Sequence, residues 1–370
     1  MNQAEAIHMF FCGDVMTGRG IDQVLPHPGN PVLYESYVRD AREYANLAET
    51  AHGAIPRPVD FDYIWGDALR EFDQTMTDVR IINLETAVTE SEDYWPDKAV
   101  LYRMNPRNIG CLKAARISCC SLANNHTLDW SDEGLRETVR TLDLAGIAHA
   151  GAGVDAAEAA SAAALDVVGK GRVIFYSFGS PTSGVPLEWG ATEDRAGVNL
   201  LADLSEETAR RIAGQMLRLT RPGDVIVASI HWGGNWGYHI PDEQISFAHR
   251  LIEEGVSIVH GHSSHHVKAI EVYRERLILY GCGDFLTDYE GISGYEQFRG
   301  DLSLMYLVKI DPRQGRLLEL RLIPMQLRRF RLNSASATDA HWLRDLLNRL
   351  GAPFATQVRM ENDYSLTLRL

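Results

Sequence analysis

The sequence predicts an α/β fold in which buried strands lie between helices. Short apolar runs alternate with amphipathic helical patterns through the first three quarters of the chain. Polar side chains that can bind a metal or carry a proton follow one strand after another. Because ligands bind outside the carboxyl ends of strands in an α/β sheet, this second observation also predicts where a functional site lies.

The alternating part of the chain contains seven predicted strands and three predicted helices. The apolar runs that predict strands are Ile7–Cys12, Val79–Leu84, Ile117–Leu122, Ala164–Val168, Arg172–Phe178, Val225–Ile230 and Ser257–Val259. The stretches with helical periodicity are Asp132–Ala145, Glu206–Leu219 and Asp242–Glu254.

From Ala269 onward the pattern changes to β-hairpins and then to a short C-terminal segment. The hairpin strands are expected at Ile270–Tyr273, Leu277–Tyr280, Leu302–Ile310 and Leu317–Ile323. A small-residue linker at Asn333–Ala337 precedes a predicted helix, Asp339–Leu350, and a last strand near Tyr364–Leu370. We therefore expect a main domain at residues 1–325 and a C-terminal helix and strand at 326–370 that pack on it.

The segment Leu25–Asp62 is rich in Pro, Gly, His and Tyr and shows no clear strand. A long insertion of this kind in a compact domain is often a binding loop or a lid. We expect a loop insertion here that acts as a lid.

Charge and cysteine content exclude several classes of protein. The formal net charge is −14 and the pI is near 5.4, which argues against a nucleic-acid or anionic-membrane partner. The five cysteines form no C-x-x-C pair, a pattern that indicates buried free thiols in a reducing compartment. With no signal peptide, membrane anchor or long apolar run, the sequence predicts a cytoplasmic protein. It does not indicate the oligomeric state.

The residues that follow the strands are the informative feature. They are Asp14, Glu85, Asn125 with His126, His231, the cluster from His260 to His266, and Asp284. Carboxylate and amide oxygens together with imidazole nitrogens suit a divalent ion such as Mn, Fe or Zn, whereas oxygen ligands alone suit Ca. Histidines that are not ligands can carry protons near neutral pH.

Several of these residues also have a structural interpretation. Asp14 after Gly13 can belong to a simple turn, and Asn124 to His126 can be the N-cap region of the next helix. His231 beside Trp232 can be a core histidine. The cluster is different, because four of the thirteen histidines lie between 260 and 266. It favours a functional role for His262, His265 or both.

At this point the motifs resemble those of the CapA family, which is associated with capsule and poly-γ-glutamate systems and belongs to the calcineurin-like metallophosphoesterase superfamily. The matching segments are residues 11–19, 83–86, 122–129, 151–153, 231–233 and 281–285, in family order. The resemblance implies a four-layer α/β/β/α sandwich, here with a small C-terminal appendage. It implies metal-centre roles for Asp14, Glu85, Asn125, His126, His231 and one or both of His262 and His265.

Three departures from that superfamily suggest one dominant metal. Met16 stands where a histidine ligand is usual, and a thioether does not replace imidazole for a hard divalent ion. Glu85 stands where a bridging Asp is usual. The histidine motif, His262 to His265, is longer by one residue. We expect one divalent ion (Mn, Fe, Zn or Ca).

A single metal surrounded by further His and Asp groups suits acid–base chemistry. Some CapA-like proteins that modify ribosomally made peptides, the lasso-peptide epimerases, invert a peptide Cα with His/Asp pairs around a metal. The resemblance therefore implies this role here for His231 and His265, oriented by Asp14 and Asp284. The substrate class is then a peptide or γ-glutamyl chain. The alternatives are a metal-dependent hydrolase of phosphoester or amide bonds and a non-catalytic component of polymer assembly.

Four further residues have weaker patterns. Arg19 can bind a substrate carboxylate or phosphate, although a structural salt bridge is an equal alternative. Trp232 and Trp236 can form an aromatic wall for substrate or fill the core. Asp129, three residues after His126, can orient that histidine.

Overall fold

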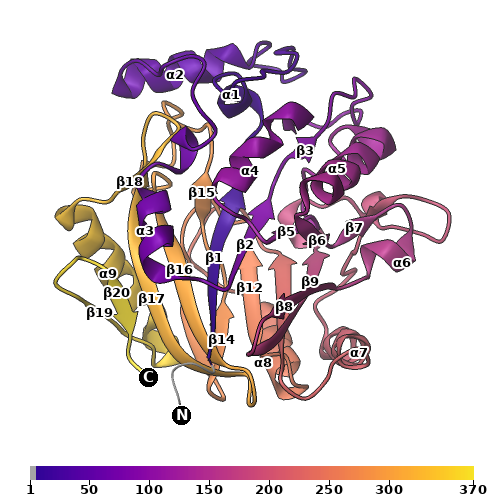
Figure 1. Cartoon of the computed structure of the whole chain (residues 1–370), viewed down its shortest axis with the longest axis vertical. Coiled ribbons are helices and arrows are strands. Elements are labelled where there is room, and N and C mark those ends of the chain that lie inside the picture. Colours follow the sequence, from indigo (N-terminus) through magenta and orange to yellow (C-terminus); the bar gives the residue numbers. More distant parts are fainter. Residues whose placement is uncertain (1–5) are drawn as a thin grey trace.

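Two β-sheets packed face to face, each covered by helices on its outer side, make up residues 6–370, which the computed structural model describes (Figure 1). The first sheet has the order β19-β20-β17-β16-β1-β2-β5-β6, with β15 beside β1 and β18 beside β17. Strands β1, β2, β5, β6 and β15 run parallel, and the others pair antiparallel. The bounds are β1 Ile7–Val15, β2 Val79–Leu84, β5 Cys119–Ser121, β6 Ala148–Ala150, β15 Asp284–Leu286, β16 Leu302–Asp311, β17 Arg316–Leu327, β18 Leu332–Ser334, β19 Val358–Met360 and β20 Leu366–Leu368.

The second sheet has the order β13-β14-β12-β11-β9-β8. Its central strands are parallel, and β13 and β8 close its edges as antiparallel hairpins. The bounds are β8 Ala163–Val167, β9 Gly171–Gly179, β11 Asp224–His231, β12 Ile258–His262, β13 Ile270–Tyr273 and β14 Arg276–Leu279. Two small pairs lie outside these sheets, β3 (Ala87–Val88) with β4 (Arg103–Met104), and β7 (Ala152–Gly153) with β10 (Gly197–Val198).

Alternating side chains of the strands separate the protein into layers. Successive residues of a strand point to opposite faces, so Phe11 contributes to the core between the sheets and Phe10 to the core under the outer helices. Helices α3 (Asp67–Thr75), α4 (Gly110–Ala114) and α5 (Ser131–Ala145) cover the first sheet, and α7 (Glu206–Leu217) and α8 (Asp242–Glu253) cover the second. The expected four-layer α/β/β/α sandwich is confirmed.

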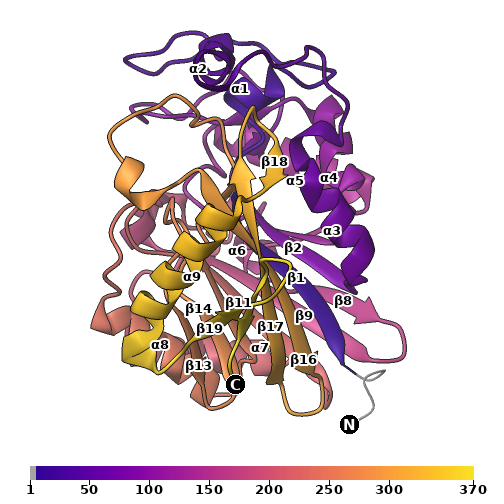
Figure 2. The same cartoon turned by 90° about the vertical axis from the view of Figure 1, so that its left-hand side faces the viewer.

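The C-terminal segment completes the first sheet. Strand β20 pairs with β17, and helix α9 (Ala337–Gly351) buries Leu343 and Leu347 in the core between the sheets (Figure 2). Residue 325, the expected end of the main domain, lies inside β17, so the first sheet continues across that position.

The insertion at residues 25–62 is not a loop throughout. Helix α2 (Arg42–His52) forms within it, and Val32 makes an isolated bridge with Asp40. Together with the short helix α1 (Arg19–Asp22), this segment lies at one end of the molecule, above the carboxyl ends of the central strands (Figure 1). The remaining helix, α6 (Ala156–Ala159), lies between β7 and β8 along the chain.

Two further expectations can be compared with the structure. All five cysteines are buried and free, as the sequence predicts. Within residues 6–370 no helix has the length and apolar character that crossing a bilayer requires.

The fold depends on one close contact between strands, at Gly13 of β1 and Gly283 just before β15. A Cβ on residue 13 would lie 1.6 Å from the Gly283 carbonyl oxygen, which accepts a hydrogen bond from the Asp14 N–H at 3.0 Å. We predict that Gly13→Ala lowers the free energy of unfolding by about 3 kcal/mol or prevents folding, because backbone on both strands must move. Denaturant unfolding measures this.

The matched control is Gly214→Ala in α7, where no atom lies within 4 Å of the added Cβ. Alanine is favoured over glycine in a helix, so this variant is expected to gain about 0.5–1 kcal/mol. Equal stability of the two variants would contradict the account of the Gly13 contact.

Candidate metal and acid–base site

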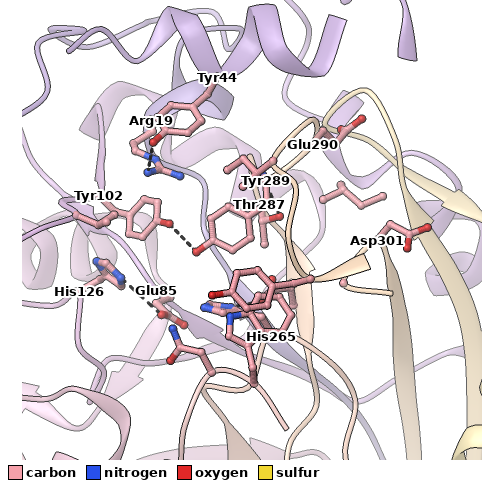
Figure 3. A pocket seen from close by; sticks show the side chains of 18 of the residues that line it. Arg19, Tyr44, Glu85, Tyr102, His126, His265, Thr287, Tyr289, Glu290 and Asp301 are labelled. Atoms are coloured by element: carbon pink, nitrogen blue, oxygen red, sulfur yellow. Dashed lines mark hydrogen bonds and ion pairs between the residues drawn. The ribbon is translucent and has the colours of Figure 1, made fainter. Parts of the chain in front are cut away.

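The carboxyl ends of strands from both sheets meet beneath one cavity of about 710 Å³. In the first sheet Asp14 on β1 is the register partner of Asp284 on β15, and in the second His231 on β11 is the register partner of His262 on β12. The cavity is lined at its floor by six of the predicted site residues, namely Glu85, Asn125, His126, His231, His265 and Asp284 (Figure 3). Asp14 and His262 are buried just outside the lining residues.

Three carboxyl groups share this buried position. Asp14, Glu85 and Asp284 are 0%, 2% and 3% exposed. The Nδ2 group of Asn83 donates to Asp14 Oδ1 at 2.8 Å and to Glu85 Oε2 at 3.1 Å, which holds two of the carboxyl groups side by side. The Ser263 N–H donates to Asp14 Oδ2 at 3.2 Å, from a residue with a φ of 104°. Strained backbone of this kind is common at functional sites.

Burial and mutual repulsion change the protonation of this group. Burial, together with the Asp284 carboxylate, raises the pKa of Asp14 to about 7. Burial and the Asp14 carboxylate also raise the pKa of Glu85 well above its usual value. Negative charge is therefore costly here unless a cation lies close by.

The histidines below the floor form a hydrogen-bonded chain whose direction can be derived. Burial lowers the pKa of His260 to about 4 and the pKa values of His262 and His231 well below the usual value, so all three rings are neutral. The Cys12 carbonyl can only accept, so His260 Nε2 donates to it at 2.8 Å. His260 Nδ1 then accepts from the Ser229 hydroxyl at 3.0 Å, and this hydroxyl accepts from His262 Nε2 at 2.9 Å.

The end of the chain fixes the free nitrogen of His231. His262 Nδ1 accepts from His231 Nδ1 at 2.8 Å, so the lone pair of His231 Nε2 faces the cavity. That nitrogen lies 2.9 Å from Asn125 Oδ1 and 3.9 Å from Glu85 Oε1, which are also acceptors. Three acceptors that converge without a donor between them fit a bound cation, or an Asn125 amide turned to donate.

A second group of possible ligands lies beside the first. Asp14, His265 and Asp284 each place a ligand atom within 4.8 Å of the others, as do Asp14, His231 and His262. The buried Asp284 Oδ2 has no hydrogen-bond partner among the described residues, so it too can accept a cation. His262 uses both ring nitrogens in the histidine chain, which gives it a positioning role toward His231 in this arrangement.

Two His–Asp pairs face the cavity from different elements. His265 Nδ1 lies 2.9 Å from Asp284 Oδ1, and His126 Nδ1 lies 2.7 Å from Asp129 Oδ2. Burial alone would lower the pKa of His265, but Asp284 raises it above the usual value. Burial lowers the pKa of His126 to about 4. The two environments thus shift the pKa values of His265 and His126 in opposite directions, as expected of an acid and a base.

Three predicted residues make contacts that differ from the functional role considered for them, and for Trp232 and Arg19 these contacts match the structural alternative. His231 is oriented by His262 and not by Asp14, whose carboxyl bonds to Asn83 and Ser263 instead. Trp232 does not line the cavity.

Trp232 is 1% exposed, and its indole donates to the Tyr280 carbonyl at 3.0 Å. It continues the alternation of Ile226, Ala228 and Ile230, which face the core under the outer helices, on the side opposite to His231. Arg19 lines the cavity, but its guanidinium is buried and bonded to Glu35 and Asp288. The structural alternative therefore describes Arg19, whereas Trp236 does line the cavity.

Sequence reasoning missed other residues at the site. Lys98 binds Asp129 Oδ1 at 2.6 Å and lies 3.1 Å from His126 Nδ1, but it occupies an irregular segment without a periodic signal. His260 and Ser229 belong to the histidine chain; the sequence signal for His260 was its place in the cluster, and Ser229 had none. Tyr102 and Tyr289 pair through their hydroxyls at 2.7 Å across 187 residues (Figure 3).

The comparison with protein families identifies the class of protein. Residues 8–289 match the family described as "Bacterial capsule synthesis protein PGA_cap". This match spans the central strands and every predicted metal ligand. The chain belongs to this family, and the resemblance to CapA proteins is confirmed.

Individual relatives support the same assignment. The chain is 47% identical over 355 residues to the "Probable polyglutamine synthesis accessory protein" of Mycobacterium tuberculosis, covering 96% of this chain and 93% of that one. It is 23% identical over 300 residues to the "PGA biosynthesis protein CapA" of Bacillus subtilis, covering 81% and 67%.

A solved structure, TT1561 of Thermus thermophilus, aligns with a TM-score of 0.37 and 11% identity over 84% of this chain and 97% of that one. The fold assignment given above rests on the sheet order and the layers.

The buried pair of Lys98 and Asp129 gives a prediction for the site. Asp129 is fully buried, so Lys98→Met leaves its carboxylate without a counter-charge and is expected to lower the free energy of unfolding by about 3 kcal/mol. The double variant with Asp129→Asn removes the stranded charge and is expected to recover part of that loss. Lys113→Met, at an exposed position of α4, is the control. If Lys98→Met is as stable as this control, Lys98 does not stabilise the buried Asp129 carboxylate.

Proposed function

We propose that this protein is a metal-dependent enzyme that moves protons on a peptide or γ-glutamyl chain with His/Asp pairs. The observation that carries the proposal is the presence of two such pairs, His126–Asp129 and His265–Asp284, at one cavity beside the converging side chains of Glu85, Asn125 and His231. The names of the relatives, which refer to polyglutamine and PGA synthesis, support an amide-linked chain of glutamyl type as the substrate class.

The metal would be held by Glu85, Asn125 and His231, with Asp14 behind them. A divalent ion of the Mn, Fe, Zn or Ca kind supplies positive charge that stabilises an enolate-like substrate oxygen when it is bound. The histidine chain fixes the His231 tautomer that a ligand needs, and the three buried carboxyl groups supply compensating negative charge.

Our specific proposal for the reaction is epimerisation of a peptide Cα. One histidine accepts the proton as the Cα–H bond breaks, and the other donates a proton to the opposite face of the same carbon. His126 and His265 suit these roles because each is oriented by its own aspartate and both line the cavity. In this proposal His126, and not His231 as the sequence suggested, is the partner of His265. The lone pair of His231 points toward Glu85 and Asn125, the other possible metal ligands.

One observation favours a hydrolase as the second candidate. Asp14 belongs to both groups of possible ligands, so a second ion can share it with His265 and Asp284. Two ions sharing a carboxylate is the arrangement of enzymes that activate water for hydrolysis. In that case His265 is a ligand and is not free to move protons.

Metal content distinguishes the two candidates. We predict one equivalent of tightly bound metal by elemental analysis after Mn²⁺ or Zn²⁺ loading, and loss of most of it in Asp14→Asn and His231→Ala. Thermal unfolding should show stabilisation of the wild-type chain by the metal, since a ligand that binds the folded state raises its stability. Two equivalents, with one lost in Asp284→Asn, would favour the hydrolase.

Isotope exchange tests the proton chemistry. In D₂O the loaded protein is expected to incorporate deuterium at Cα of a γ-glutamyl or α-linked glutamyl oligomer without cleaving it, as measured by mass spectrometry. His265→Gln and His126→Gln should each reduce the exchange at least about 100-fold, the usual contribution of a positioned acid or base. His249→Gln, on the outer helix α8, is the matched control and should retain the wild-type rate. Cleavage without exchange would reject the epimerase.

A further inference from the structure

The walls of the cavity contain three strong cations, but their donors are already used. Arg19, Lys98 and Arg299 are the lysine and arginine residues among those that line it in the described part of the chain. Arg19 is 3% exposed. It donates to Glu35 at 2.7 Å and to Asp288 at 3.0 and 2.5 Å, so it ties the insertion to the loop after β15 and has no charge to offer a ligand.

The other two cations are paired in the same way. Lys98 binds Asp129 at 2.6 Å and donates to the Val100 carbonyl at 2.8 Å. Arg299 binds Asp301 and Asp339, each at 2.8 Å. A carboxylate on a substrate would therefore have to displace an acid of the protein to reach any of these cations.

The walls carry no excess of positive charge. Outside the floor, the three cations that line the cavity are matched by three acids that line it, namely Asp301, Glu290 and Glu296. Four further acids lie behind the walls and pair with the same cations, namely Glu35, Asp288, Asp129 and Asp339. This count leaves out the floor residues Asp14, Glu85 and Asp284, whose charge a bound metal would balance. The whole chain adds long-range repulsion of anions through its net charge of −14.

The remaining wall surface suits neutral polar groups. Trp236 stacks on Tyr295 with ring centroids 4.1 Å apart and an interplanar angle of 2°, and Tyr102 and Tyr289 present their paired hydroxyls (Figure 3). Primary and secondary amides can stack on aromatic faces and exchange hydrogen bonds with phenol hydroxyls without a counter-charge. Like charges brought together in such a site cost affinity and suppress the wrong partner.

We propose that the cavity selects a chain whose side groups are uncharged amides and discriminates against the same chain with free carboxylates. This inference rests on the proposed function, because it assumes that the amide-linked substrate occupies this cavity. The cavity selects for side groups without charge. Glu296, an exposed acid that lines the cavity, is one of the residues that repel a carboxylate on the ligand.

The test compares two matched probes on the metal-loaded full-length protein. One is a γ-glutamyl pentamer with free α-carboxylates, and the other is the same pentamer with those groups as primary amides. Calorimetry is expected to give a dissociation constant at least ten-fold lower for the amide form at about 20 mM salt. The difference should shrink toward two-fold at about 500 mM salt, where exposed charges are screened.

A charge-reversal variant tests the assigned cause. Glu296 is exposed, and its carboxylate accepts the N–H of Gly294 within the same loop, so Glu296→Lys is expected to fold. It should tighten binding of the carboxylate pentamer several-fold and leave the amide pentamer within two-fold. Glu207→Lys, on the exposed face of α7, is the matched control and should change neither.

The outcomes separate the inference from the proposed function. Equal or tighter binding of the carboxylate pentamer, or equal effects of the two lysine variants, overturns the charge selection while the proposed function stands. Failure of both pentamers to bind the metal-loaded protein overturns the proposed function, and the charge selection with it.

Discussion

The rest of the site depends on the contact between β1 and β15. Gly13 and Gly283 bring the two strands so close that no side chain fits between them, and this closeness aligns Asp14 with Asp284. Glu85, held beside Asp14 by Asn83, adds a third carboxyl group. Like charges concentrated in a buried position are costly, and this cost is the physical basis of the cation site that we propose here.

The histidine chain and the insertion surround these three carboxyl groups. The histidine chain that starts at the Cys12 carbonyl delivers a lone pair of His231 to the cluster, from the opposite sheet. The insertion forms the roof of the cavity through Tyr37, Tyr44 and His52 and is anchored by the buried Arg19. Rigid parallel strands therefore hold the polar groups, while the irregular segments shape the space above them.

The sequence predicted the residues whose position follows from topology. Asp14, Glu85, His231 and the histidine cluster follow strands, and parallel strands that share a sheet end at the same edge. The central strands and the helices α5, α7, α8 and α9 had clear periodicities, whereas α2, α3 and α4, which are shorter, were not predicted. The change of pattern at Ala269 corresponded to two antiparallel pairs, β13 with β14 and then β16 with β17.

The sequence did not predict interactions that depend on side-chain direction or distant pairing. Arg19 forms an ion pair with Asp288, 269 residues away in the sequence, and no local sequence pattern predicts that pairing. Trp232 turns into the core one residue after the end of β11. Met16 predicted a missing ligand, but Asp284 lies beside Asp14 and offers a carboxylate there, a fact that only the strand pairing reveals.

Pairing between distant residues also explains why no lysine or arginine among the described residues of the cavity walls is free of an acidic partner. Composition alone shows an acidic protein, whereas the structure shows that each cation lining the cavity is paired with an acid of the protein. This pairing is the basis of the charge selection that we propose for the cavity.

The central claim is that buried carboxyl groups and the His231 lone pair bind a divalent cation at the strand ends. Anomalous diffraction from crystals soaked in Mn²⁺ or Zn²⁺ and measured at the metal edge tests it most directly. The account predicts a peak within bonding distance of Glu85, Asn125 and His231, where carboxylate, amide and imidazole ligands meet. The absence of a peak there, or a peak only at surface acids, would contradict it.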